Sequence, residues 1–187
     1  KQHLTLIGCG NMGGAMVRGW LNNGLAGKDL TIVDPYLPVA ADGVELVRDV
    51  SALKPPADWL LLAIKPQQLA DSAAAIQKII GPDTVVLSIL AGVEIASLRR
   101  YFPTAKAIIR VMPNMPVALG KGVIAMLADS DNPAITKVAD DLMRPLGLVE
   151  GIDGDALFEA VTALSGCGPA FVFRFIDALA SAGEQLG

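Results

Sequence analysis

A glycine-rich turn near the beginning of the chain constrains the fold more than any other feature of the sequence. Residues 8–13 read Gly-Cys-Gly-Asn-Met-Gly, directly after the apolar run at 4–7 and at the start of a segment with helical apolar spacing. A G-x-G-x-x-G pattern between a strand and a helix predicts a site for a dinucleotide. The alternative is a glycine-rich turn without a ligand, and the strand-turn-helix context argues against it.

The positions of this turn have distinct expected roles. Gly8 permits the tight turn, Gly10 lets a pyrophosphate approach the backbone, and Gly13 lets the helix pack close to the strand. The start of the helix presents free N–H groups and the positive end of its dipole to the phosphates. The predicted nucleotide-binding turn comprises Gly8, Cys9, Gly10, Asn11, Met12 and Gly13.

The composition is that of a globular chain and argues against several function classes. Of the 187 residues, 52% are hydrophobic and 18% are charged, which is unlike a disordered chain. The net charge is −4 and no Lys/Arg cluster occurs, so nucleic acid is not an expected partner. Cys9 and Cys167 lie far apart without metal-ligand spacing, so we expect no metal site and a cytoplasmic location. No apolar run approaches ~18 residues, and no signal-peptide pattern is present, so no membrane segment is expected.

Strand and helix patterns alternate through about residue 152. Strands are predicted at 4–7, 30–33, 44–47, 59–64, 85–90, 107–112, 123–127 and 148–152, and helices at 11–23, 67–80, 94–101 and 133–143. This alternation predicts an α/β fold with a mostly parallel sheet of the Rossmann type and helices on both faces. Two consecutive helices follow, at 156–164 and 169–186. The chain is therefore predicted to comprise a dinucleotide-binding domain at 1–153 and the beginning of an all-helical domain at 154–187.

The last predicted helix is apolar around nearly its whole circumference. Between Ala170 and Ala182 its only charged residues are Arg174 and Asp177. A helix of this kind must be covered on all sides, and we expect further polypeptide and a second subunit to cover it. The alternative is a hydrophobic helix packed on the sheet, within the limits on exposed apolar patches in monomers.

An acidic residue at the end of the second strand indicates which nucleotide is bound. Asp34 follows Gly13 by 21 residues, close to the spacing of about 20 at which a carboxylate binds the adenine ribose 2′-OH. No Arg stands beside Asp34 in the sequence, so this feature favours NADH over NADPH. The alternative is that Asp34 caps a turn before Pro35.

Polar groups at later strand ends indicate where the nicotinamide end lies. Ligands of open α/β sheets bind beyond the carboxyl ends of the strands. Lys65 stands at such an end and Pro66 restricts it to an extended conformation, so we expect a cofactor contact rather than a surface lysine. Asn114 lies between two prolines at the end of another strand and is either a polar contact in the site or a turn residue.

Small residues join the two final predicted helices. Ser165-Gly166-Cys167-Gly168-Pro169 is predicted to be a loop, because Gly166 and Gly168 allow close backbone approach and Pro169 suits a first helical turn. The loop either lines a substrate cleft or serves only as a connector.

Five segments, in the expected order, resemble the Δ1-pyrroline-5-carboxylate reductase family. They are residues 7–16 (IGCGNMGGAM), 63–66 (AIKP), 88–93 (SILAGV), 110–116 (RVMPNMP) and 160–173 (AVTALSGCGPAFVF). The first segment is generic for dinucleotide-binding proteins, whereas the last two are specific. The resemblance implies a Rossmann domain followed by a helical domain that forms a homodimer or higher homo-oligomer. It also implies hydride transfer from NAD(P)H to the C=N carbon of the small molecule pyrroline-5-carboxylate, giving L-proline.

The resemblance also assigns residues to the site. The nucleotide contacts would be the turn at 8–13 together with Asp34, Ala63, Ile64, Lys65, Pro66 and Ala91. The residues near the nicotinamide and the substrate would be Met112, Pro113 and Asn114, and Ser165, Gly166 and Cys167 are also assigned to the substrate cleft.

Several departures from the family pattern limit this assignment. Met115 stands where family members usually have Thr, and Cys167 where they have Ser. Family chains continue beyond the point that corresponds to residue 187, and their substrate-carboxylate loop lies in that later region. Many members also favour NADPH, against the expectation from Asp34.

Two other functions stay open from the residues alone. A β-hydroxyacid dehydrogenase would place a catalytic Lys in its helical part, and no Lys follows Lys137. A module that binds NAD(P) without chemistry is the second alternative. An imine substrate suits a chain whose only histidine is His3, because an iminium already carries the proton that a ketone would need from a donor.

Overall fold

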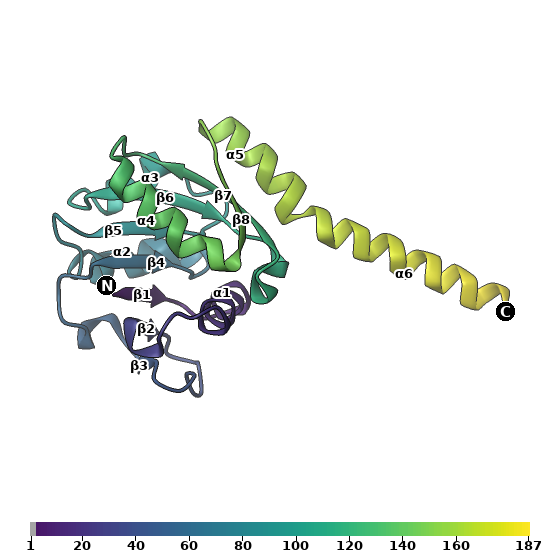
Figure 1. Cartoon of the computed structure of the whole chain (residues 1–187), viewed down its shortest axis with the longest axis horizontal. Coiled ribbons are helices and arrows are strands. Elements are labelled where there is room, and N and C mark those ends of the chain that lie inside the picture. The colour runs from purple at the N-terminus through teal and green to yellow at the C-terminus, as the bar shows by residue number, and fades with distance from the viewer. Residues whose placement is uncertain (1–2) are drawn as a thin grey trace.

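The computed structural model describes residues 3–187. Its sheet has the strand order β3-β2-β1-β4-β5-β6-β7-β8 (Figure 1). The strands are β1 (Leu4–Ile7), β2 (Leu30–Val33), β3 (Glu45–Val47), β4 (Trp59–Leu62), β5 (Val85–Ser88), β6 (Ala107–Met112), β7 (Gly122–Ala128) and β8 (Gly147–Gly151). The helices are α1 (Asn11–Asn22), α2 (Leu69–Gln77), α3 (Ile95–Tyr101), α4 (Pro133–Met143), α5 (Asp155–Val161) and α6 (Gly168–Leu186).

The sheet is parallel except at one pair of strands, because β7 runs antiparallel to β6. The order reverses at β1, which pairs with β2 on one side and β4 on the other. Ligands of such sheets bind at this switch point, beyond the carboxyl ends of the strands. The predicted Rossmann-type α/β fold is confirmed.

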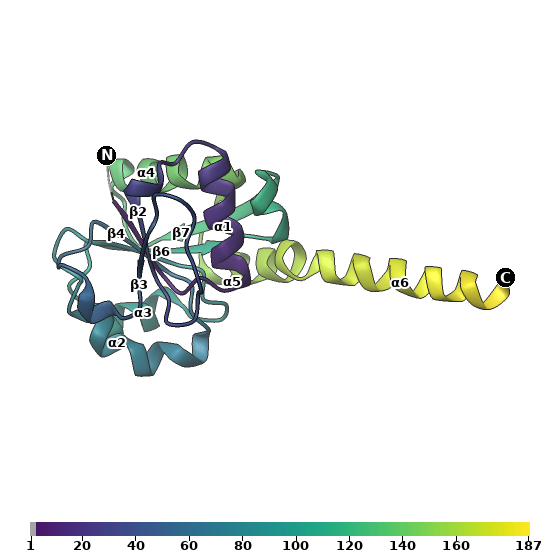
Figure 2. The same ribbon diagram turned by 90° about the horizontal axis from the view of Figure 1, so that it is seen from below.

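Helices cover both faces of the sheet, as Figure 2 shows. On one face, α1 and α4 bury apolar side chains that include Trp20 and Met143. On the other face, α2 and α3 bury Ile76 and Leu98. Because both faces are covered, the central strands consist of almost uninterrupted apolar residues.

Two predicted strands end earlier than expected. The strands predicted at 59–64 and 85–90 end at Leu62 and Ser88. The apolar residues that follow them lie where the chain leaves the sheet at its carboxyl edge. These residues therefore form the edge at which a nucleotide is expected rather than the sheet itself.

The C-terminal region is one continuous helix, which we call the helical arm (residues 155–186). The predicted loop at 165–169 is wrong. Between α5 and α6 the chain forms a π-helical turn at Thr162–Gly166, and the Cys167 N–H donates to the Thr162 carbonyl (3.2 Å). Pro169 lies in the first turn of α6, where its missing N–H is tolerated, so the glycines and the proline widen the helix without ending it.

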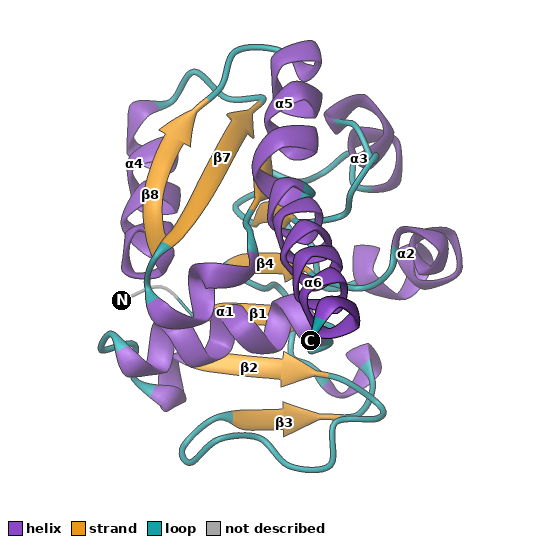
Figure 3. Cartoon of the chain, turned by 90° about the vertical axis from the view of Figure 1, so that its right-hand side faces the viewer, coloured by secondary structure: helices purple, strands orange, loops and turns teal. Residues whose placement is uncertain are grey.

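Within the helical arm, α5 lies against β7, whereas α6 projects away from the sheet (Figure 1) and points toward the viewer in Figure 3. Phe171 and Phe173 are 70% and 67% exposed, so the alternative of a helix packed on the sheet is wrong. By length and composition alone, this helix is also able to cross a membrane. The absence of a membrane partner therefore stays a prediction.

Candidate active site

The glycine turn has the geometry expected of a phosphate-binding turn. Gly8 has a φ of +89°, which other residues rarely adopt. A Cβ added to Gly13 would lie 2.8 Å from the Gly8 carbonyl oxygen, so only glycine lets α1 pack this close to β1. A Cβ on Gly10 would meet no atom within 4 Å. The space in front of Gly10 is therefore open for a ligand, and the first N–H groups of α1 have no partners within the helix.

A cavity of about 760 Å³ opens beside this turn at the carboxyl edge of the sheet. Seven predicted cofactor residues line it: Gly8, Cys9, Gly10, Asp34, Ala63, Ile64 and Lys65. The lining also includes Tyr36, Arg48, Gln68 and Ser72, which sequence reasoning did not single out. Asn11, Met12, Gly13, Pro66 and Ala91 do not line this cavity. Of these, Ala91 is an exposed residue that follows β5.

The Asp34 carboxylate ties the glycine turn to the loop after β2. Its Oδ2 accepts the Cys9 N–H (2.8 Å), and its Oδ1 accepts the N–H groups of Tyr36 and Leu37 (both 2.8 Å). Burial acts to raise the pKa of Asp34, but these three hydrogen bonds and the charge of Arg48 outweigh it and lower the pKa below its ordinary value. Asp34 therefore caps the turn that contains Pro35 and also lines the pocket. A role in capping this turn does not exclude a role in binding the ribose.

An arginine stands beside Asp34 in space, contrary to the expectation from its sequence neighbours. The Arg48 guanidinium donates to the carbonyls of Asp34 (3.2 Å), Leu37 and Pro38 (3.3 Å). Arg48 follows β3, the strand next to β2, so the parallel pairing brings it to the same edge. A cation therefore lies beside Asp34 in the fold, although none stands beside it in the sequence.

The strand end at 63–66 is fixed by a local hydrogen-bond pair. The Lys65 N–H donates to Gln68 Oε1 (3.0 Å), and the Gln68 N–H donates to the Lys65 carbonyl (2.9 Å). Pro66 begins the short 3₁₀ helix at Pro66–Gln68. The backbone is held by these bonds, while the exposed Lys65 side chain stays at the mouth of the pocket.

The Cys9 thiol is a poor nucleophile in this position. Burial, and after it the negative charge of Asp34, raises the pKa of Cys9 above its ordinary value. The thiolate is the reactive form, so Cys9 lines the pocket as a small apolar residue.

The predicted substrate residues come together where β6 meets the helical arm. Asn114 is buried, and its side chain accepts the Val123 N–H (2.9 Å) and donates to the Ser165 carbonyl (3.4 Å). A Cβ on Gly166 would lie 4.0 Å from the Met112 Sδ. The π-helical turn therefore faces the end of β6, and π turns within α-helices are frequent at functional sites. Cys167 follows this turn and is exposed.

A buried arginine, which sequence reasoning missed, joins β6 to the helical arm. The side chain of Arg110 is 1% exposed and pairs with Asp155 Oδ1 (2.6 Å) and Glu159 Oε1 (2.7 Å). Its guanidinium also lies over the Phe158 ring, 4.1 Å from the centroid. Two acidic residues at i and i+4 of one helix, with a lone arginine in an apolar strand, were the available sequence signal.

Fold and site together define a Rossmann-type nucleotide-binding protein that carries a helical arm. Comparison with known proteins narrows this class. The family model for pyrroline-5-carboxylate reductase dimerisation matches residues 155–187, and the ketopantoate reductase PanE/ApbA model matches residues 4–132. Pyrroline-5-carboxylate reductase of Aquifex aeolicus is 37% identical over 97% of this chain and 69% of its own length. The enzyme of Pseudomonas aeruginosa is 30% identical over 98% and 70%. The chain belongs to the pyrroline-5-carboxylate reductase family.

Solved structures agree with this assignment. The Plasmodium falciparum pyrroline carboxylate reductase, whose structure contains NADP, has a TM-score of 0.86 and 26% identity and covers 100% of this chain. The Coxiella burnetii pyrroline-5-carboxylate reductase has a TM-score of 0.83 and 28% identity. This chain covers 71% and 72% of those two chains. The ketopantoate reductase match includes β1 to β7 and ends before α4, β8 and the helical arm.

Proposed function

We propose that this protein reduces 1-pyrroline-5-carboxylate to L-proline with NAD(P)H. The observation that carries the proposal is the pairing of two sites on one sheet edge: an open glycine turn at β1, and the buried Asn114 facing the π-helical turn of the arm. Membership of the family supplies the substrate. The reduced nicotinamide supplies a hydride, and the residues of the chain bind and align the two reactants.

The residues present fit a pyridine nucleotide. The open space at Gly10 and the α1 N-terminus suit the pyrophosphate. Asp34 and Arg48 would flank the adenosine ribose, and Ala63, Ile64, Lys65, Pro66 and Ala91 would line the path toward the nicotinamide. Asn11, Met12 and Gly13 contribute through the helix start rather than through the cavity wall.

The substrate end is proposed to lie at the junction of β6 and the arm. Met112, Pro113 and Asn114 would form one wall, and Ser165, Gly166 and Cys167 the other. Asn114 holds the Ser165 carbonyl and so fixes the distance between the walls. Hydride transfer needs reacting atoms about 3–3.5 Å apart, and a rigid junction serves that alignment. An iminium substrate brings its proton with it, so the chain needs no acid for the transfer.

We propose that the chain divides into a nucleotide-binding domain at 1–153 and a helical domain at 154–187. Family membership supports a homo-oligomer formed through this helical domain. A homodimer is the simplest closed assembly, because one isologous interface satisfies both apolar arms.

For the cofactor we propose that both NADH and NADPH are accepted. Asp34 still has acceptor capacity for a ribose hydroxyl, although its three amide bonds reduce it. Arg48 has donors beyond those used on the loop carbonyls and offers a charge-assisted contact to a 2′-phosphate. NADPH binding is then predicted to depend on Arg48, and NADH binding on Asp34.

The decisive assay follows oxidation of the reduced nicotinamide in the presence of pyrroline-5-carboxylate. The proposal expects rapid oxidation and formation of L-proline. A β-hydroxyacid dehydrogenase would instead reduce NAD⁺ with 3-hydroxy acids, and a non-catalytic module would bind nucleotide without oxidising it. Either of these outcomes rejects the proposed activity.

A further inference from the structure

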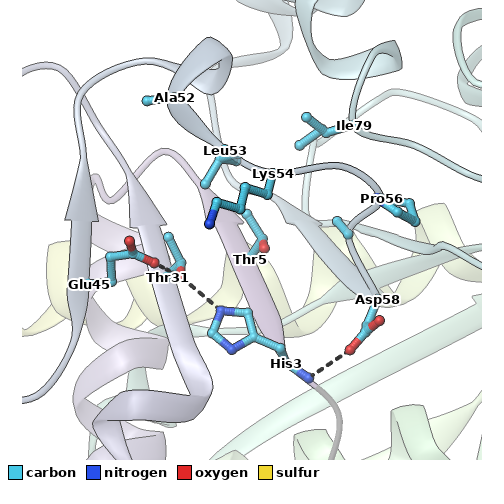
Figure 4. A pocket seen from close by; sticks show the side chains of 11 residues that line it. His3, Thr5, Thr31, Glu45, Ala52, Leu53, Lys54, Pro56, Asp58 and Ile79 are labelled. Carbon is cyan, nitrogen blue, oxygen red and sulfur yellow. Dashed lines mark hydrogen bonds between the residues drawn. The ribbon is translucent and has the colours of Figure 1, made fainter.

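The opposite edge of the sheet carries a second pocket, at the beginning of β1, β2 and β3 (Figure 4). Its volume is about 380 Å³. The polar side chains that line it are His3, Thr5, Thr31, Glu45, Lys54 and Asp58. Ligands of open α/β sheets normally bind at the carboxyl edge, so this pocket is unrelated to the nucleotide site.

A row of polar residues crosses the floor of this pocket. Thr5 and Thr31 are paired in the parallel register of β1 and β2, and Thr31 pairs with Glu45 of β3. One step along the same face, Ile7 and Val33 belong to the apolar core. Strands buried on both faces are normally apolar throughout, so the polar row is a local departure that the core does not require.

At one end of the row, His3, Thr31 and Glu45 form a chain of hydrogen bonds. The Thr31 hydroxyl donates to Glu45 Oε2 (2.7 Å), and its oxygen lies 2.7 Å from His3 Nε2. A hydroxyl has one hydrogen, which goes to the carboxylate, so Nε2 is the donor to Thr31. The His3 backbone N–H also donates to Asp58 Oδ2 (3.3 Å).

The other polar groups of the pocket lack partners among the residues that the structure describes. The Thr5 hydroxyl makes no hydrogen bond within residues 3–187, although Thr5 is only 5% exposed. The Lys54 ammonium makes no ion pair within the same range. Figure 4 shows the Lys54 side chain reaching over the pocket toward the side that holds Thr31 and Glu45. Both groups therefore face the pocket with hydrogen-bonding capacity that a ligand there could use.

We propose that this pocket binds a free α-amino acid. A simple anion would face the carboxylates of Glu45 and Asp58, and a simple cation would face Lys54. A zwitterion complements both charges of the pocket. Its carboxylate would bind Lys54 and the Thr5 hydroxyl, and its ammonium would bind the carboxylates of Glu45 and Asp58. The apolar wall of Leu53, Pro56 and Ile79 would receive a small aliphatic side chain.

The proposal is tested by calorimetric titration of the full protein with L-valine. Valinamide, which lacks the carboxylate, and isovalerate, which lacks the ammonium, are expected to bind at least about tenfold more weakly, because each forgoes a charge-assisted contact. Amide shifts in NMR spectra should fall at Thr5, Thr31 and Lys54, and saturating NADPH should not displace the amino acid. Binding of isovalerate as tight as that of valine, shifts confined to the carboxyl edge, or no binding at all would overturn the proposal.

Two variants locate the site independently of the proposed reductase activity. Thr5→Val keeps the side-chain shape and removes the hydroxyl, and Lys54→Met removes an exposed charge without touching the core. Each is expected to weaken valine binding at least about fivefold, with NADPH binding unchanged. Lys121→Met, an exposed lysine outside the pocket, is the matched control. Unchanged valine affinity in both pocket variants would show that the amino acid binds elsewhere.

Discussion

The sheet domain and the helical arm solve the problem of apolar surface in opposite ways. In the sheet, strands such as β4 and β6 are buried completely by helices of the same chain. In α6 no residue is buried, and Phe175 and Ile176 are 65% and 54% exposed. The central strands are therefore covered within the chain, whereas the apolar face of α6 is left uncovered within it. The two regions meet at the junction formed by Arg110 and Asn114, which is also where we place the substrate.

The largest effect is expected from a substitution that disrupts the exposed apolar face of α6. Phe175→Asp places a carboxylate in the middle of the exposed apolar face, where burial against another subunit would be costly. We expect the homo-oligomer to dissociate, as measured by sedimentation equilibrium, while the sheet domain keeps its circular dichroism. Lys137→Gln on α4 is the control and should leave the mass unchanged. An oligomer that survives Phe175→Asp would place the interface outside α6.

The next effect concerns the Arg110 junction. Replacing both carboxylates, by Asp155→Asn with Glu159→Gln, leaves a buried guanidinium without compensation and should cost about 3–5 kcal/mol in the free energy of unfolding. Arg110→Met removes the charge and keeps an apolar side chain, while the two half-exposed acids return to water. It should therefore cost less. Urea unfolding at fixed protein concentration measures the free energy of unfolding of both variants. A larger loss for Arg110→Met than for the double variant would contradict the claim that Asp155 and Glu159 compensate a buried charge.

A third prediction contrasts two neighbouring glycines of α1. Gly13→Ala forces a Cβ to within 2.8 Å of the Gly8 carbonyl, whereas a Cβ on Gly14 meets nothing closer than 3.5 Å. Gly13→Ala should weaken NADPH binding at least about tenfold, which corresponds to about 1.4 kcal/mol. Gly14→Ala should leave it unchanged. Fluorescence titration with NADPH compares the two variants. Equal affinities would show that the close approach of α1 to β1 does not affect nucleotide binding.

A smaller effect separates the two residues at the adenosine ribose. Arg48→Met should lower NADPH affinity several-fold and change NADH affinity little, because a charge-assisted contact to phosphate is lost. Asp34→Ser should weaken NADH and improve NADPH. Ratios of kcat/KM for the two nucleotides measure the change. If the kcat/KM ratio for the two nucleotides is unchanged in both variants, neither Arg48 nor Asp34 distinguishes a ribose 2′-hydroxyl from a 2′-phosphate.

The smallest effect is the pH dependence that Asp34 contributes to stability. Its pKa is lower in the folded state than in the unfolded chain, so its stabilising contribution is complete above the unfolded pKa of about 3.9 and is lost as the pH falls through the folded pKa. Asp34→Asn should flatten this acid limb of the stability curve. Circular dichroism during acid titration measures unfolding of the wild type and of Asp34→Asn. Identical unfolding curves below the unfolded pKa would show that the Asp34 carboxylate does not contribute to stability.

Local patterns predicted the sheet and the nucleotide turn. The turn at 8–13 and the spacing to Asp34 depend on residues close in sequence, and both have the expected geometry. Arg48 was missed because it reaches Asp34 only through the pairing of β2 with β3. Periodicity along one strand carries no information about such a neighbour.

The junction with the arm was harder to predict for a related reason. Arg110 is 45 and 49 residues from its two acidic partners. Gly166, Gly168 and Pro169 are typical of a loop, yet the helix continues through them, because the π-helical turn includes Gly166 and Pro169 lies in the first turn of α6, where its missing N–H is tolerated. The association of Asn114 with Ser165 therefore required the three-dimensional structure.

The most direct test of the account is to map NADPH binding onto the amide NMR spectrum of the assembled protein. We predict that shifts concentrate at 8–13, 34–38 and 63–68 on the carboxyl edge, with smaller changes at 112–114 and 165–167. Shifts at the beginning of β1 to β3, or no saturable shifts, would contradict the placement of the nucleotide against the glycine turn.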